Sequence, residues 1–196
     1  MKKTLICLLA LFWAWALHAQ NNASTLEVRR IEGEIGLGLV FATGKLQFDR
    51  VNTGATGHIE LRYNLRRQPI DVGVQVSGAI FHRESDMAGR LKFRGWNLLA
   101  VSDYNYRRGR RVSLFGGLGL GYASIINSAP ITFDNTQPHW GRISTGDKTG
   151  SFCVMPRIGV EFFNHLRLTL DYKWQEKANC HFSLTLGGVF GGGRKK

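Results

Sequence analysis

SFCVMPRIGVEFFNHLRLTLDYKW, residues 151–174, places an apolar side chain or a proline at every second position. The alternation stops at Phe163–His165 and resumes from Leu166. Two period-2 segments joined by a tight connection predict a β-hairpin. One face of this hairpin is apolar and ends in aromatic rings, whereas the other carries charges of both signs. In a soluble sandwich the apolar face would meet a second sheet, and in a membrane barrel it would meet lipid.

Six further segments show the same period, and with the hairpin they make eight expected strands. One segment changes phase, because Leu91 and Phe93 do not share the apolar set that begins at Trp96. One extra residue would switch the two faces, so we expect a β-bulge near Gly95. The six segments are 28–42, 55–66, 70–81, 91–106, 111–123 and 180–190.

The expected connections alternate between long and short. Outer-membrane barrels place short turns on the periplasmic side and longer loops outside, so eight strands bring both termini to the periplasm. The long connections are 43–54, 82–90, 124–150 and 175–179, and the short ones are 67–69, 107–110 and 163–165.

Aromatic residues gather toward the strand ends, which is where the interfacial girdles of a membrane barrel lie. The loop-end set is Phe41, Phe93, Trp96, Tyr122, Phe152, Tyr172, Trp174 and Phe182. The turn-end set is Tyr63, Tyr104, Tyr106, Phe162 and Phe190.

Charged residues share the face opposite to the apolar one. Exposing the apolar face to water would leave a patch far larger than soluble monomers tolerate. Enclosing the charges requires mutual pairing, which five basic and seven acidic residues allow. We therefore predict an all-β fold, an eight-stranded antiparallel up-and-down transmembrane β-barrel. The charges expected inside are Arg30, Glu32, Glu34, Glu60, Arg62, Asp71, Asp103, Arg157, Glu161, Arg167, Asp171 and Lys173.

Residues 1–19 have the composition of a secretory signal peptide. Lys2 and Lys3 precede an uncharged apolar run, and Leu17–Ala19 forms a plausible cleavage site. The run is short for a membrane-spanning helix, which needs about 20 residues. We expect residues 20–196 to form the outer-membrane β-barrel domain. Export permits a disulfide between Cys153 and Cys180, and two free thiols are an equal alternative.

The formal charge is +12, and removal of Lys2 and Lys3 leaves +10. For an exported chain the expected anionic partners are lipid phosphates rather than nucleic acid. Near anionic headgroups each cation contributes on the order of 1 kcal/mol. The cations expected at the periplasmic end are Arg66, Arg67, Arg107, Arg108, Arg110, Arg111, Arg194, Lys195 and Lys196. Those at the loop end, facing lipopolysaccharide, are Lys45, Arg50, Arg83, Arg90, Lys92, Arg94, Arg142 and Lys148.

The signal peptide, the alternating strands, the rhythm of connections and the final-strand residues Leu184, Leu186 and Phe190 resemble one family. They are similar to the small outer-membrane barrel proteins typified by OmpX and the OmpA membrane domain. The resemblance covers the mature chain and implies a narrow barrel with a polar, ion-paired interior. It also implies assembly by the outer-membrane insertion machinery.

His181 and Ser183 are the candidate catalytic pair. Their spacing resembles that of outer-membrane lipid A deacylases, in which a histidine activates a serine and a carboxylate orients the histidine. Asp171 or Glu176 would have to supply the carboxylate. We interpret the pair as polar lumen residues, and we expect no enzyme activity and no cofactor. The histidines and cysteines have no metal-binding spacing, so we expect no metal site.

The predicted function is that of an integral outer-membrane barrel protein of a Gram-negative bacterium, with a structural or surface-interaction role. The loop Ser124–Gly150 is the expected contact surface for an extracellular partner, and a periplasmic partner is a second option. We expect a monomer surrounded by lipopolysaccharide and phospholipid. The alternatives are a small passive channel and, ranked lower, a lipid-modifying hydrolase. Eight strands enclose an interior that side chains just fill, which favours a plug over a pore.

Overall fold

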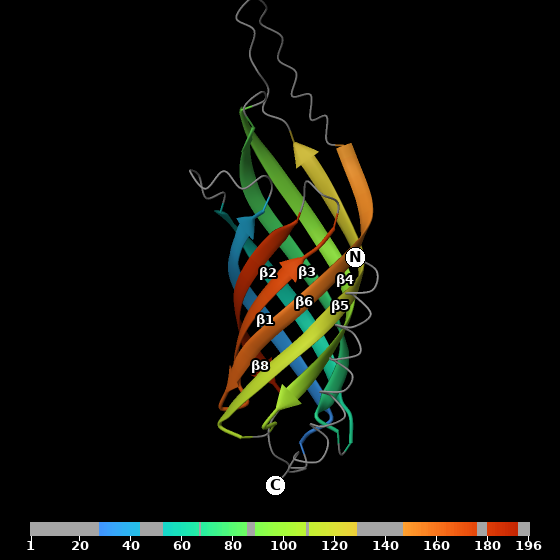
Figure 1. Cartoon of the computed structure of the whole chain (residues 1–196), viewed down its shortest axis with the longest axis vertical. Coiled ribbons are helices and arrows are strands. Elements are labelled where there is room, and N and C mark those ends of the chain that lie inside the picture. Colours follow the sequence, from blue (N-terminus) through green and yellow to red (C-terminus); the bar gives the residue numbers. More distant parts are fainter. Residues whose placement is uncertain are drawn as a thin grey trace, which may run out of the picture.

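The computed structural model of the chain describes residues 28–43, 53–66, 68–85, 89–108, 110–128, 147–175 and 180–191. Every strand pairs antiparallel with its neighbours in sequence, and β1 closes the sheet on β8. The product is a tall, narrow barrel with strongly tilted strands (Figure 1). The predicted fold class is confirmed. The strands are β1 (Ile31–Ala42), β2 (Thr53–Asn64), β3 (Ile70–Ser85), β4 (Gly89–Tyr106), β5 (Val112–Ser128), β6 (Asp147–Phe162), β7 (Leu166–Lys173) and β8 (His181–Phe190).

The hairpin predicted over residues 151–174 is β6 and β7. Its register pairs Phe162 with Leu166 and continues to Arg157 opposite Asp171. Phe163 and Asn164 both have positive φ, at 55° and 59°, and the His165 amide donates to the Phe162 carbonyl at 3.1 Å. Two successive left-handed residues reverse the chain with a twist that suits the flanking strands.

The two faces of the sheet differ as the alternation predicts. Leu61 is 60% exposed, whereas the next residue, Arg62, is 1% exposed. The same contrast recurs in β7, where Leu168 faces outward and Arg167 is buried. The apolar side chains therefore cover the outside of the barrel, and the charged ones are enclosed. Among the described residues, no helix is long and apolar enough to cross a membrane.

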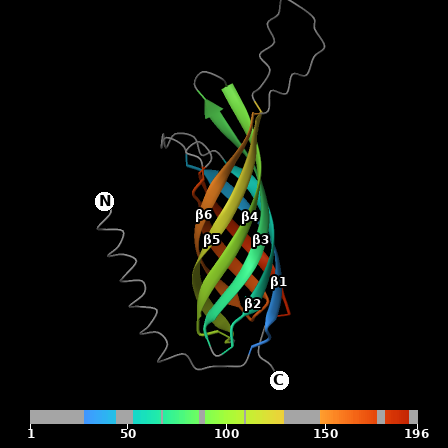
Figure 2. The same ribbon diagram turned by 90° about the vertical axis from the view of Figure 1, so that its right-hand side faces the viewer.

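Two expected loops are shorter than predicted. Residues 82–90 are not a polar loop, because β3 and β4 remain paired up to Ser85 opposite Gly89. The interval Ser124–Gly150 is likewise wrong at both ends, since β5 and β6 remain paired as far as Asn127 opposite Asp147. Figure 2 shows the green end of the β3–β4 hairpin extending past β1 and β2. A ladder satisfies backbone hydrogen bonds in water as well as in lipid, so strands continue where the apolar alternation stops.

The expected β-bulge near Gly95 is also wrong. Pairing passes one-to-one through this position, with Ala79 opposite Gly95 on one side and Ile125 opposite it on the other. The change of phase instead marks a change in the polarity of the side chains that face the lumen. Phe93 is the register partner of Phe81, whose side chain is buried in an apolar cluster within the lumen. On the outside, Arg94 is exposed, so polarity inverts while register does not.

Candidate functional site

One arginine joins opposite walls of the barrel. Arg157 on β6 donates to Glu60 on β2 through Nη1–Oε2 at 2.5 Å and Nη2–Oε1 at 2.9 Å. It also donates to Asp103 on β4 through Nε–Oδ1 at 2.7 Å and Nη2–Oδ2 at 2.8 Å. Because β2 and β6 are four strands apart in an eight-stranded barrel, the bond to Glu60 crosses the lumen.

Two further arginines extend this network toward β1. Arg62 Nη1 donates to Glu34 Oε2 at 2.5 Å and to Glu60 at 3.0 Å. Arg167 bonds to Asp103, lies 3.7 Å from Glu34 and stacks on the Phe115 ring with its guanidinium carbon 3.5 Å from the centroid.

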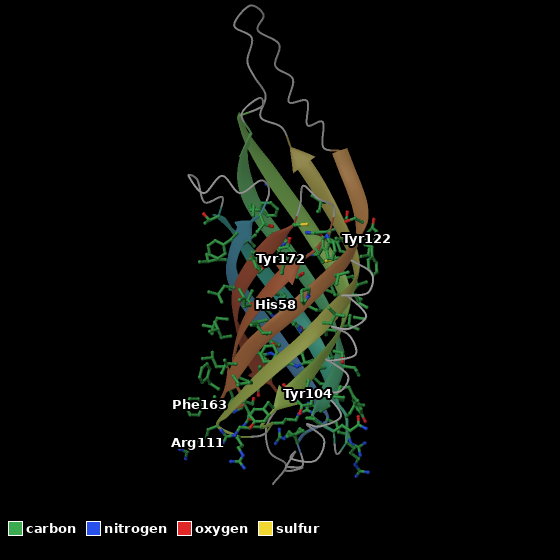
Figure 3. All side chains as sticks on the ribbon, viewed as in Figure 1. His58, Tyr104, Arg111, Tyr122, Phe163 and Tyr172 are labelled. Carbon is green, nitrogen blue, oxygen red and sulfur yellow. The ribbon has the colours of Figure 1, made fainter. Side chains whose placement is uncertain are left out.

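His58 Nε2 lies 3.0 Å from Glu34 Oε1, and the His58 ring lies at mid-height in the barrel (Figure 3). All these groups are buried, so the charges are compensated by one another rather than by water.

A smaller polar group occupies the turn end of the lumen. Asn105 Nδ2 donates to Asp71 at 2.6 Å, and Arg108 Nη2 lies 3.6 Å from the same carboxylate. Burial lowers the pKa of Arg108, while the Asp71 carboxylate acts in the opposite direction. Asn64 donates to Glu32 at 2.6 Å. A small cavity here is lined by Val28, Glu32, Asn105, Arg108, Ser113, Glu161 and Asn164.

Eleven of the twelve charges expected inside are buried, and Arg30 is the exception. It precedes the first residue of β1 and lies exposed at the rim, where the parity of the strand no longer constrains it. The interior is also less polar than the family resemblance implies. Two apolar clusters lie inside: Val40, Ala79, Phe81 and Ile125 form one, and Leu99, Val101, Ala123, Cys153 and Met155 form the other.

The candidate catalytic residues His181 and Ser183 both face the lumen near its loop end, where each contacts different partners. Lys173 Nζ donates to Asp171 Oδ1 at 2.7 Å and to Ser183 Oγ at 3.4 Å. His181 Nδ1 lies 3.3 Å from Gln175 Nε2, and its ring packs against Phe81 with centroids 5.3 Å apart. The structure thus brings Asp171 and Ser183 together through an ammonium group. Glu176, the other candidate carboxylate, lies outside the described residues.

Burial weighs against hydrolysis at this cluster. Ser183 is fully buried and His181 is 1% exposed, so neither side chain is open to solvent in this structure. Sequence reasoning had placed Lys173 inside but had not linked it to the pair. Gln175 was missed, because it follows the last regular alternation of β7.

Cys153 and Cys180 are free thiols. Cys153 belongs to the second apolar cluster, whereas Cys180 Sγ donates to the Gln175 carbonyl at 3.6 Å. Of the two alternatives left open by the sequence, free thiols are the one observed. Within the described ranges, no group of three or more His, Cys, Asp or Glu residues could hold a metal ion.

Exposed aromatic rings form a belt at each end of the barrel. In the loop-end belt the ring centroids of Trp96 and Tyr122 are 6.0 Å apart, and those of Tyr172 and Phe182 are 4.6 Å apart. Figure 3 shows Tyr122 and Tyr172 toward one end and Tyr104 and Phe163 toward the other. Phe163, 65% exposed, was missed because it occupies the turn and not a strand. In the turn-end belt it joins Tyr63, Tyr106 and Phe190.

Several solved structures of bacterial proteins share this architecture. Neisserial surface protein A matches with a TM-score of 0.58 and 12% identity, covering 84% of this chain and 99% of the other. The N-terminal barrel of Pseudomonas aeruginosa OprF has a TM-score of 0.50 and 14% identity, covering 84% and 100%. OprG from the same organism has a TM-score of 0.50 and 10% identity, covering 83% and 97%. At these identities the likeness shows the fold alone.

Among curated protein sequences, none matches this chain. Residues 7–179, however, match the family described as outer membrane protein beta-barrel domain. This match spans most of the chain and agrees with the closed barrel, the apolar exterior and the two aromatic belts. The resemblance to small outer-membrane barrels is therefore confirmed, and the chain belongs to the outer-membrane β-barrel domain family.

Proposed function

We propose that this outer-membrane barrel serves a structural or surface-interaction role and is neither a channel nor an enzyme. The observation that carries the proposal is the bond from Arg157 to Glu60, which crosses the lumen and is reinforced by Asp103. A lumen filled by mutually paired side chains offers no continuous path for a solute. Interactions with external partners would then involve the rims and the loops of the barrel.

We further propose that residues 1–19 direct export and that the mature chain, 20–196, inserts as a monomer in a Gram-negative outer membrane. The short turns after β2, β4 and β6 would face the periplasm, and the loops at the other end would face outward. The hairpin extensions of β3–β4 and β5–β6 support this orientation, because they lengthen the barrel at the loop end alone.

The loop between β5 and β6 is the proposed contact surface for an extracellular partner. Its central part, residues 129–146, lies outside the described residues, so this proposal rests on its length and composition. The strands that carry it are paired up to Asn127 and Asp147, which fixes both ends of the loop above the barrel. Loops on rigid scaffolds are common sites of recognition.

Site-specific photo-crosslinking on intact cells tests this role. A photoreactive residue at Trp140, in the loop, should give protein adducts. The same residue at Trp96, in the lipid-facing belt, should not. Replacing residues 129–146 with a short Gly-Ser connection should preserve heat-modifiable migration on a gel and abolish capture of the crosslinked partner. Equal adducts from the two positions, or capture that survives the deletion, would overturn the proposal.

The two alternatives make separate predictions. A passive channel would show conductance steps in planar bilayers, yet the Arg157 bridge and the two apolar clusters occupy the path. A lipid-modifying hydrolase would require access to Ser183, which is fully buried. Fold similarity does not decide between an enzyme and a non-enzyme, because function resides in sites built on folds.

A further inference from the structure

Six described arginines lie exposed at the turn end of the barrel, and we call them the turn-end arginines. They come from three separate parts of the chain, before β1, after β2 and between β4 and β5. They are Arg29, Arg30, Arg66, Arg107, Arg110 and Arg111. Arg67, Arg194, Lys195 and Lys196, also expected at this end, lie outside the described residues.

Backbone and side-chain bonds hold these segments side by side. The Asn64 amide donates to the Arg30 carbonyl at 2.7 Å, which places Arg30 beside the β2–β3 turn. Arg108 donates to the carbonyls of Gln68 and Ile70, each at 3.3 Å, and so ties the β4–β5 turn to the β2–β3 turn. The segments that carry the turn-end arginines are therefore linked to one another along the rim, and we call this row of arginines the arc.

The arc continues to the β6–β7 turn. The Phe163 amide donates to the Arg111 carbonyl at 2.6 Å, which holds the backbone of Arg111 beside that of Phe163, whose ring is exposed. Figure 3 shows Arg111 and Phe163 together at the same end of the barrel.

No carboxylate neutralises this arc within the described part of the turn end. Glu32, Asp71 and Glu161 are the acidic residues at this height, and all three are buried toward the lumen. Among the described residues, the outer surface of this end consequently carries a net positive charge without a neighbouring carboxylate. Such a surface attracts anions over a range set by ionic strength.

The aromatic belt fixes the depth of the arc in the membrane. Tyr63 and Tyr106 are 43% and 55% exposed, and amphipathic rings are most stable at headgroup depth. Arg66 and Arg107 follow Tyr63 and Tyr106 by three residues and one residue, so we expect their guanidinium groups to lie at the depth of the lipid phosphates. A planar guanidinium binds phosphate oxygens in pairs, which an ammonium cannot match.

We propose that the turn-end arginines and the adjoining rings bind the headgroups of anionic phospholipids in the periplasmic leaflet. The inference rests on the proposed orientation, which sets the short turns against the phospholipid leaflet. Phosphatidylglycerol is the chemical class that fits, because it offers a phosphodiester without a compensating cation. The site would anchor the turn end in the leaflet and hold the barrel upright.

Lipid binding by the purified full-length protein tests the site. Dioleoylphosphatidylglycerol and dioleoylphosphatidylcholine are titrated into the protein in a neutral detergent, and bound lipids are counted by native mass spectrometry. Wild type should prefer the anionic lipid at least tenfold. The variant R66Q/R107Q/R110Q/R111Q should lose most of that preference, since each cation near an anionic surface is worth roughly fivefold. The quadruple lysine variant should retain part of it.

Arg94→Gln is the matched control. Arg94 is also exposed, but it lies at the loop end beside Ile80 and Ile126. This variant should bind phosphatidylglycerol as wild type does, and heat-modifiable migration should show that all variants fold. Equal binding of the two lipids by wild type would overturn the site, and so would a preference that survives the quadruple change or is lost in Arg94→Gln. Lipopolysaccharide, titrated in the same way, separates the two leaflets. A preference for lipopolysaccharide over phosphatidylglycerol that the quadruple change removes would overturn the orientation, and the leaflet assignment with it.

Discussion

Arg157 and Glu60 are 97 residues apart in sequence and stand on opposite walls of the barrel, yet they share two hydrogen bonds. Both side chains are buried, so neither charge has water as an alternative partner. An eight-stranded barrel is narrow enough for one arginine to span its interior. The barrel is thus closed by its own backbone ladder and also tied across the middle by a charge pair.

Arg157→Met removes the cation and leaves Glu60 and Asp103 buried together without it. Stranding buried charges in this way should cost about 3–5 kcal/mol of unfolding free energy. Urea titration in lipid vesicles, followed by gel migration, measures the loss. Arg94→Met is the control, because Arg94 is exposed at the loop end and its loss should change stability by less than about 0.5 kcal/mol. If both variants lose a similar amount of unfolding free energy, the cross-lumen pair contributes no more to stability than an exposed arginine does.

Leu168→Arg tests the orientation of the faces. Leu168 points outward in the lipid-facing set, and an arginine near mid-bilayer should cost about 2–4 kcal/mol. Thr169→Ser, at the next position, faces the lumen and should be nearly silent. The same urea titration compares them. If the two variants lose stability equally, the apolar face does not meet hydrocarbon.

Alternation alone predicted which face each residue of β7 occupies, because one face meets lipid and the other does not. The same reasoning failed at Gly95, where the alternation changes phase while register continues. The sequence pattern reports only the polarity of each face. At the loop end, the apolar side chains of a cluster around Phe81 and Ile125 lie inside the barrel. The pattern there resembles a bulge although no residue is extra.

The partners within the lumen could not be predicted either. Parity places Arg157 and Glu60 inside, but it does not say which carboxylate an arginine reaches across the barrel. That choice depends on strand tilt and on side-chain length, neither of which appears in a period-2 pattern. Arg30 shows the converse limit, because parity assigned it to the inside and the strand begins one residue later.

Two adjacent glycines on β5 offer a sharper test of the network. A Cβ at Gly117 would clash with Asp103 Oδ1 and with the Ser102 carbonyl oxygen, so both the Asp103 side chain and the adjoining β4 backbone would have to shift. Gly117→Ala should therefore cost about 1–3 kcal/mol through overpacking, and more if the bonds of Asp103 to Arg157 are lost. At Gly116 the nearest atom would be 3.8 Å away, so Gly116→Ala should be neutral or slightly stabilising. Equal urea midpoints for the two variants would contradict the packing of Asp103.

Ser183→Ala addresses the candidate catalytic pair. The Ser183 hydroxyl is fully buried and accepts a hydrogen bond from Lys173, which is itself held by Asp171. Ser183→Ala removes one weak hydrogen bond of Lys173 and leaves its bond to Asp171 in place. The unfolding free energy should therefore fall by about 1 kcal/mol or less. Mass spectra of lipid A and phospholipids from cells expressing wild type, the variant or neither should be identical. A lipid change that appears with wild type and vanishes with Ser183→Ala would establish a hydrolase and refute the role proposed for this barrel.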